Sequence, residues 1–97
     1  MQFDGFDWDA GNEAKCRKHG VSRAEIEGLF GGMPLIGPDV KHSTEETRFR
    51  AIGATKEERY LFVVFTLRRK ENNVLIRPIS ARTMHKKEIA SHEKEIP

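Results

Sequence analysis

The chain has 97 residues, a net charge of +2, 33% charged residues, 37% apolar residues and one cysteine. This length fits a single domain over residues 1–97, and one cysteine excludes an internal disulfide and a cysteine-rich metal site. The four histidines are scattered without the spacing of zinc ligands, so we expect no metal and no other cofactor. No apolar run approaches the roughly 18 residues of a membrane span, and the acidic N-terminus differs from a signal peptide, which predicts a cytoplasmic protein with no membrane partner.

The first segment predicts an extended arm followed by a helix. Residues 3–9, FDGFDWD, place aromatic residues among acids, which is typical of a short strand or arm. Asp9 then provides an N-cap for a helix over residues 10–19, because its carboxylate can accept hydrogen bonds from the free amides of the first turn. Gly20 would end this helix in the left-handed conformation.

The second helix has a clearer start signal. Ser22 and Glu25 have the spacing of a capping box, and apolar residues within 26–30 make one face of the helix before Gly31 ends it. After it, residues 33–39 predict a brief edge strand, because the two prolines in this segment lack the amide that a central strand must donate.

Three runs rich in β-forming residues follow, over residues 47–55, 59–69 and 73–82. The connections between them are short enough for antiparallel hairpins. The middle run is apolar on both faces, so we expect it at the centre of the sheet.

The last segment predicts a C-terminal helix with Thr83 as its cap. The predicted helices are therefore grouped before and after a continuous antiparallel meander. This order gives an α+β fold in which two N-terminal helices and a C-terminal helix pack on a twisted antiparallel sheet.

Positive charge is concentrated in the last third of the chain. Residues 68–97 carry a net charge of +4, whereas residues 1–67 carry −2. Such an asymmetry indicates an anionic partner such as nucleic acid. On charge alone, a solvated basic face that binds no ligand explains the pattern equally well.

Three arginines are the main candidates for a phosphate site. Arg68 ends the predicted central strand, and Arg77 and Arg82 lie on the strand that returns beside it. Strand alternation places Arg82 and Ser80 on one face and Arg77 on the other, unless the chain bends between them. Pro78 offers such a bend, because proline breaks the ladder and often marks a bulge. The alternative is that these arginines form ion pairs at the sheet edge with Glu45, Glu46 or Glu57.

His19 lies beside Lys18 at the end of the first predicted helix. An imidazole titrates at about pH 6.5, so His19 is a candidate general acid or base. The competing role is structural, because a histidine at a helix end commonly bonds the last carbonyl groups of its helix.

The remaining chemistry is a set of Arg, Lys and His side chains without a Ser-His-Asp set, a glycine-rich phosphate loop or a paired-carboxylate motif. Such a set suits metal-free RNA cleavage. Cations stabilise the charge that develops on a phosphate, a base removes the proton of a ribose 2′-hydroxyl, and an acid protonates the leaving oxygen.

Four stretches occur along the chain in a recognisable order: FDWDAGNEAKCRKHGVS, RFRAIGAT, LFVVFTLR and IRPISARTMHKKE. In this order and spacing they resemble the BrnT family, the toxins of bacterial type II toxin–antitoxin pairs. Together they cover most of the chain, and the ordered set is more specific than any single stretch.

The resemblance implies a RelE-like fold and a ribonuclease activity that halts translation. It also implies a small antitoxin of the BrnA type, with a ribbon-helix-helix part that binds DNA. The chain itself would then meet DNA only through this partner, and its own substrate would be RNA.

The resemblance also suggests roles for individual residues. We expect Arg68 and Arg82 to contact the scissile phosphate, and His19 or Lys18 to transfer protons. Arg77 would support RNA binding or form an edge ion pair. Further contacts to the RNA backbone are expected from Ser80, His85, Lys86 and Lys87.

Two other functions fit the same sequence. One is a non-catalytic module that binds RNA or another protein. The other is a degenerate toxin that keeps its fold and binds only its antitoxin.

Overall fold

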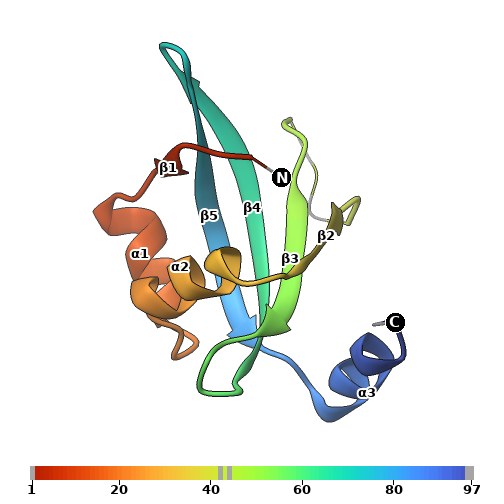
Figure 1. Ribbon diagram of the computed structural model, residues 1–97. Helices are drawn as coiled ribbons and strands as arrows, with labels where there is room; N and C mark the ends of the chain where they lie inside the picture. The colour runs from red at the N-terminus through yellow and green to blue at the C-terminus, as the bar shows by residue number, and fades with distance from the viewer. Residues whose placement is uncertain (1, 42, 44, 96–97) are drawn as a thin grey trace.

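The structure is a computed structural model that describes residues 2–41, 43 and 45–95. Within these residues, three helices and a five-stranded sheet form an α+β fold (Figure 1). The elements in chain order are β1 (Gly5–Phe6), α1 (Ala10–Arg17), α2 (Arg23–Gly31), β2 (Leu35–Pro38), β3 (Phe49–Ala54), β4 (Tyr60–Lys70), β5 (Asn73–Thr83) and α3 (Lys86–Glu95).

The two N-terminal helices begin where their caps predict. Asp9 accepts a hydrogen bond from the Asn12 N–H (2.9 Å), and the Asn12 side chain accepts one from the Asp9 N–H (2.8 Å). Ser22 and Glu25 make the same reciprocal box at the start of α2. Gly20 has a φ of 78° and makes the left-handed turn between the two helices. A residue with a side chain would be strained in this backbone conformation.

The sheet has the strand order β1-β5-β4-β3-β2, so β4 is central, as its apolar faces predict. The four strands from β2 to β5 form an antiparallel meander.

The expectation of a wholly antiparallel sheet is wrong at one edge, where β1 pairs with β5 in parallel. The arm starts beside Val74, whose carbonyl accepts the Asp4 N–H, and continues to Ile76, whose carbonyl accepts the Asp7 N–H. This direction places the start of α1 beside the middle of β5, where Asn12 contacts Pro78. The sheet is therefore mixed.

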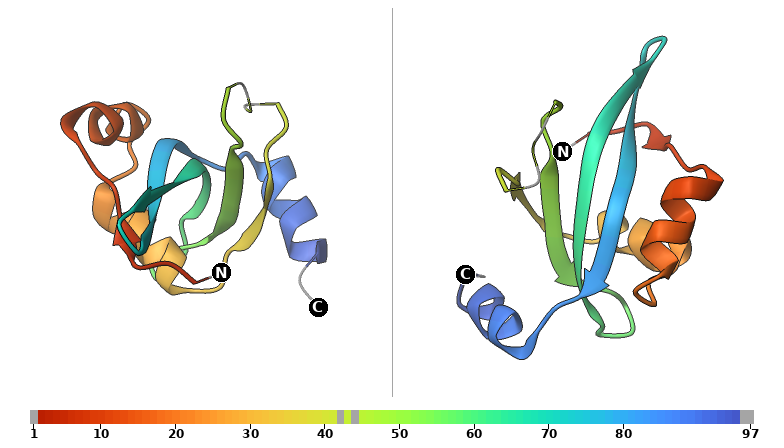
Figure 2. Two further views of the ribbon diagram at one scale, coloured as in Figure 1. Left: turned by 90° about the horizontal axis from the view of Figure 1, so that it is seen from above. Right: turned by 180° about the vertical axis from the view of Figure 1, so that it is seen from behind.

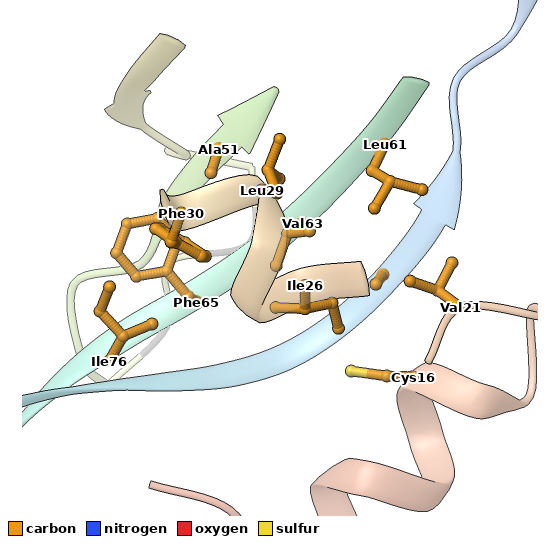
Figure 3. Close-up of a cluster of buried hydrophobic side chains, with 11 residues drawn as sticks. Cys16, Val21, Ile26, Leu29, Phe30, Ala51, Leu61, Val63, Phe65 and Ile76 are labelled. Carbon is orange, nitrogen blue, oxygen red and sulfur yellow. The ribbon is translucent and has the colours of Figure 1, made fainter. Parts of the chain in front are cut away.

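The hydrophobic core lies between the sheet and the pair α1 and α2 (Figure 3). From β4, alternate residues Leu61, Val63 and Phe65 are fully buried on this side, and α2 contributes Ile26 and Leu29. Full burial of such a side chain contributes about 1.5–3 kcal/mol, so this layer is the main source of stability.

The face of the sheet turned away from α1 and α2 is called the open face below. Seen from above, α1 and α2 lie on one side of the sheet and α3 on the other (Figure 2). Tyr60 holds α3 through an edge-to-face contact with the buried His92, with ring centroids 6.1 Å apart. α3 therefore flanks one end of the open face.

The predicted cap of the last helix is wrong, because Thr83 belongs to β5 and α3 begins at Lys86. Thr83 pairs with Leu61, and the next N–H, of Met84, still bonds the Tyr60 carbonyl (2.9 Å). Strand pairing continues as long as β4 offers a partner, and the helix therefore begins two residues later than a cap at Thr83 predicts.

Candidate nucleotide-binding pocket on the open face

A pocket of about 430 Å³ lies on the open face of the sheet. Strands β3, β4 and β5 form its floor, because Arg50 pairs with Val64 and Val64 pairs with Ser80. The helical side of the molecule contributes His19, and α3 contributes Glu88. The full lining is His19, Asp39, Lys41, Arg50, Phe62, Val64, Ser80, Ala81, Arg82 and Glu88.

A β-bulge in β5 decides which side chains reach this face. Val64 pairs with Ser80 and Phe65 pairs with Pro78, so Ile79 is an extra residue on β5. Directly opposed residues share a face, and the bulge therefore restores Arg77 to the face of Ser80 and Arg82. This confirms the bend expected at Pro78.

Asn12 anchors the bulge from the other side of the strand. Its side-chain amide donates to the Pro78 carbonyl (2.9 Å) and to the Asp7 carbonyl (3.0 Å), and its oxygen caps α1 at Asp9. Asn12 is itself buried. The Asn12 side chain thus connects the N-terminal arm, the start of α1 and the bulge of β5.

Arg82 is held in a fixed position at the edge of the pocket. It donates to both oxygens of Glu88, at 2.8 and 2.9 Å, and its guanidinium lies 4.4 Å from the centre of the Phe62 ring. The bonds from Arg82, assisted by the His85 N–H, lower the pKa of Glu88 from 4.5 to about 2, and Glu88 raises the pKa of Arg82. The pair is fully ionised at neutral pH, and the Arg82 Nε–H is not used by Glu88.

Arg68 forms an ion pair with Glu46 (2.7 Å). The hydrogen bond from Arg68 lowers the pKa of Glu46. The edge ion pair with Glu46, considered above as the alternative role of the arginines, is therefore present.

Arg77 is also paired. It reaches around the sheet edge to Asp9 (2.8 Å) and Asp7 (3.5 Å). The hydrogen bond to Asp9 raises the pKa of Arg77. The pKa of Asp9 is lowered, first by the Asn12 N–H and then by Arg77. Neither of these acids was foreseen from the sequence, because they belong to the arm that runs along β5.

Arg68 and Arg82 do not meet. Arg82 pairs with Phe62, which lies six residues from Arg68 along β4, or roughly 20 Å at about 3.3 Å per residue. Each arginine also has its own carboxylate. The expected contact of both side chains with one phosphate therefore does not fit the arrangement of the strands.

The other predicted site residues divide into two groups. His19 and Ser80 line the pocket with Arg82. The remaining four are exposed and are not among the lining residues: Lys18 at the end of α1, and His85, Lys86 and Lys87 at the start of α3.

Sequence reasoning missed the other seven lining residues, which are Asp39, Lys41, Arg50, Phe62, Val64, Ala81 and Glu88. Arg50 and Phe62 each lie on a strand that was predicted, but their position beside Ser80 and Arg82 depends on the register between strands. Glu88 falls within the predicted C-terminal helix and was given no role there. The signal in the sequence is an acidic residue within two helical turns after Arg82, which can pair with it.

In the part of the chain that the structure describes, no three His, Cys, Asp or Glu side chains are grouped in a way that could hold a metal ion. None of the described helices is long and apolar enough to cross a membrane.

Comparison with known proteins identifies one family. The family described as "Ribonuclease toxin, BrnT, of type II toxin-antitoxin system" matches residues 8–88. A search of curated proteins finds no match. The matched segment includes α1, α2, the whole β2–β5 meander and the Arg82–Glu88 pair. The chain therefore belongs to the BrnT family of ribonuclease toxins, and this membership implies an antitoxin partner.

Proposed function

We propose that the chain is a metal-independent endoribonuclease that cuts RNA in the pocket of the open face and so inhibits translation. It would act as one RelE-like toxin domain over residues 1–97, in the cytoplasm. The observation that carries the proposal is the meeting of His19 with Ser80 and Arg82, from two distant parts of the sequence, in one pocket.

The proposed reaction is the attack of a ribose 2′-oxygen on the adjacent phosphorus. The bond to the 5′-oxygen breaks, so the products end in a 2′,3′-cyclic phosphate and a 5′-hydroxyl. His19 would move a proton at the 2′-oxygen or the leaving oxygen, because an imidazole ring can both accept and donate a proton. Lys18 is the alternative for this step, although it lies outside the pocket lining.

Arg82 would stabilise the charge that develops on the phosphate, through the Nε–H edge that Glu88 leaves unused. A fixed donor needs little reorganisation during the reaction, and its removal typically costs about 10²-fold or more in rate. Ser80 would help to orient the same phosphate. Contacts to the RNA backbone outside the pocket would come from Arg68, Arg77, His85, Lys86 and Lys87.

A labelled single-stranded RNA tests this function. We expect cleavage that continues in excess EDTA and gives 2′,3′-cyclic phosphate ends. Cleavage that stops in EDTA and returns with added metal would contradict the metal-independent route. Cleavage with 5′-phosphate ends would contradict attack by the 2′-oxygen.

The antitoxin is proposed to be of the BrnA type, with a ribbon-helix-helix part that binds DNA. We propose that it adds apolar burial to charge pairing, since surface charge pairs alone contribute only about 0–1 kcal/mol each. Among the described residues, the exposed large apolar side chains are Met33, Ile36 and Val40, all on or beside β2.

One observation favours a second function, a toxin that binds its partner without cutting RNA. Arg68, Arg77 and Arg82 are all engaged by carboxylates of the same chain. If these pairs persist when RNA binds, the arginines are structural. RNA binding without cleavage in the assay above would identify this case.

A further inference from the structure

Arg50 differs from the arginines considered so far. It lies on β3, is exposed and lines the pocket. Ion pairs engage Arg68, Arg77 and Arg82, but no carboxylate of the described residues pairs with Arg50. Among the described residues its guanidinium is therefore not used in an ion pair, and it can donate to an anion in the pocket.

The register of the sheet places Arg50 close to Arg82. Arg50, Val64 and Ser80 form one row across three strands, and Arg82 lies two residues beyond Ser80 on β5. With strands about 4.8 Å apart and about 3.3 Å per residue, the Cα atoms of Arg50 and Arg82 are roughly 12 Å apart on the same face. Arg68 is roughly 20 Å from Arg82 by the same measure. Arg50 is therefore the better placed of the two to share a ligand with Arg82.

Arg82 and Arg50 differ in whether a carboxylate of the chain pairs with them. Arg82 is fixed by Glu88 and Phe62, and its charge is largely offset. Arg50 is exposed and forms no ion pair with a described residue, although Asp39 lines the same pocket. A guanidinium without a carboxylate partner can bind a phosphate through two parallel hydrogen bonds, whereas a lysine ammonium binds it as a point charge.

We propose that Arg50 is the principal phosphate-binding residue of the pocket, and that it holds one phosphodiester of an RNA strand together with Arg82. This inference rests on the proposed ribonuclease function and names a contact in it that the sequence did not indicate. Arg50 takes the place that the sequence suggested for Arg68.

The test uses three variants: Arg50→Ala, Arg50→Lys and Arg69→Ala. Arg69 is the matched control, because it is exposed at the far end of β4, lies outside the pocket lining and has no ion pair among the described residues. The ligand is a single-stranded 2′-O-methyl RNA, which lacks the attacking hydroxyl. Its affinity is measured at several salt concentrations, and thermal melting confirms that each variant is folded.

We expect Arg50→Ala to reduce the slope of log affinity against log salt by about 0.7, the value for one phosphate contact on a single strand. Its cleavage rate on unmodified RNA should fall by about 10²-fold. Arg50→Lys should keep most of the salt slope but recover only part of the rate, because lysine lacks the planar fork. Arg69→Ala should stay close to the parent protein in both measurements.

Two results would overturn the inference, and they are distinguishable. If the parent protein cleaves RNA and Arg50→Ala matches Arg69→Ala in slope and rate, Arg50 is not the phosphate contact and the proposed function stands. If the folded parent protein neither binds nor cleaves RNA, the proposed function fails, and the role of Arg50 fails with it.

Discussion

The ion pair between Arg82 and Glu88 is the most specific feature of the pocket at the scale of single residues. Its two hydrogen bonds and the Phe62 ring fix the guanidinium in one orientation. Both side chains remain about one-third exposed. Solvent therefore screens the pair, and its contribution to stability is at most about 1 kcal/mol. Its larger effect is to position Arg82.

The low pKa of Glu88 gives the first prediction. Because its folded pKa, about 2, lies below its ordinary value of 4.5, the carboxylate stabilises the fold above pH 4.5, and this contribution is lost as the pH falls toward 2. Glu88→Gln should therefore lower the free energy of unfolding at pH 7 and flatten its pH dependence between these values. Urea titrations at several pH values measure this, with the exposed Glu57→Gln as control. An unchanged acid limb in Glu88→Gln would show that the pair does not form in solution.

His19 gives the second prediction. If it transfers a proton, His19→Gln should lower the cleavage rate and remove one limb of the pH profile near neutrality, with little change in melting temperature. The side chain is exposed, so its removal should cost little packing. A lower melting temperature with an unchanged rate would instead assign His19 to capping α1. Lys18→Gln is the matched comparison at the neighbouring position.

At the scale of elements, the bulge in β5 decides which of its side chains share the open face with Ser80 and Arg82. Without the extra residue Ile79, residues on one side of the bulge would point to the opposite face, since side chains alternate along a strand. Asn12 supports the bulge by donating a hydrogen bond to the Pro78 carbonyl. The geometry of the pocket thus depends on a side chain that does not line it.

Asn12→Ala gives the third prediction. It removes one cap bond and leaves the Pro78 and Asp7 carbonyls without their donor, so the free energy of unfolding should fall by about 1–3 kcal/mol. Urea denaturation measures the loss, and the exposed Lys15→Ala on the same helix is the control. Cleavage by the folded fraction should also fall, because Arg82 and Ser80 follow the bulge. Full stability and full activity in Asn12→Ala would show that the bulge needs no anchor.

Much of the element arrangement follows from local patterns. The caps at Asp9 and Ser22 and the central position of β4 are confirmed, because capping boxes and two apolar faces are encoded within short segments. The parallel direction of β1 is not local, since a two-residue strand carries no signal of its direction. The true start of α3 was missed because β4 continues to pair with Thr83.

The site was only partly predictable for the same reason. Arg82, Ser80 and His19 were chosen as candidates, and the structure places them in one pocket. Arg50 was not chosen, because its place beside Ser80 depends on how three strands align, and this register cannot be read from the sequence. Arg68 was grouped with Arg82 because both lie near strand ends in the sequence, although the antiparallel pairing carries them to different ends of β4.

At the scale of the whole molecule, folding redistributes the charge asymmetry of the sequence. The acids of the first two-thirds of the chain pair with arginines of the last third: Asp7 and Asp9 with Arg77, and Glu46 with Arg68. Exposed basic side chains without an ion pair among the described residues include Lys41 and Arg50 in the pocket and Lys86 and Lys87 at the start of α3. We expect these surfaces to attract both RNA and the antitoxin.

The partner gives the fourth prediction. Because apolar burial is insensitive to charge screening, the complex with the antitoxin should survive gel filtration in about 0.5 M salt, where the Debye length is well below 10 Å. Co-expression with the adjacent small open reading frame, followed by this step, is the measurement. Met33→Ser with Val40→Ser should weaken the complex more than Lys86→Ala does. A complex that separates in salt would show that charge pairing alone holds it.

The central claim is that this pocket cuts RNA through the 2′-hydroxyl of the nucleotide at the cut. The most direct test compares single-turnover cleavage, in EDTA, of two RNA strands that differ only by one 2′-deoxy nucleotide at the cleavage position. We predict that the deoxy strand binds with similar affinity and is not cut there, while the unmodified strand is cleaved by the parent protein and about 10²-fold more slowly by Arg82→Ala. Cleavage of the deoxy strand at the same position and rate would contradict the account.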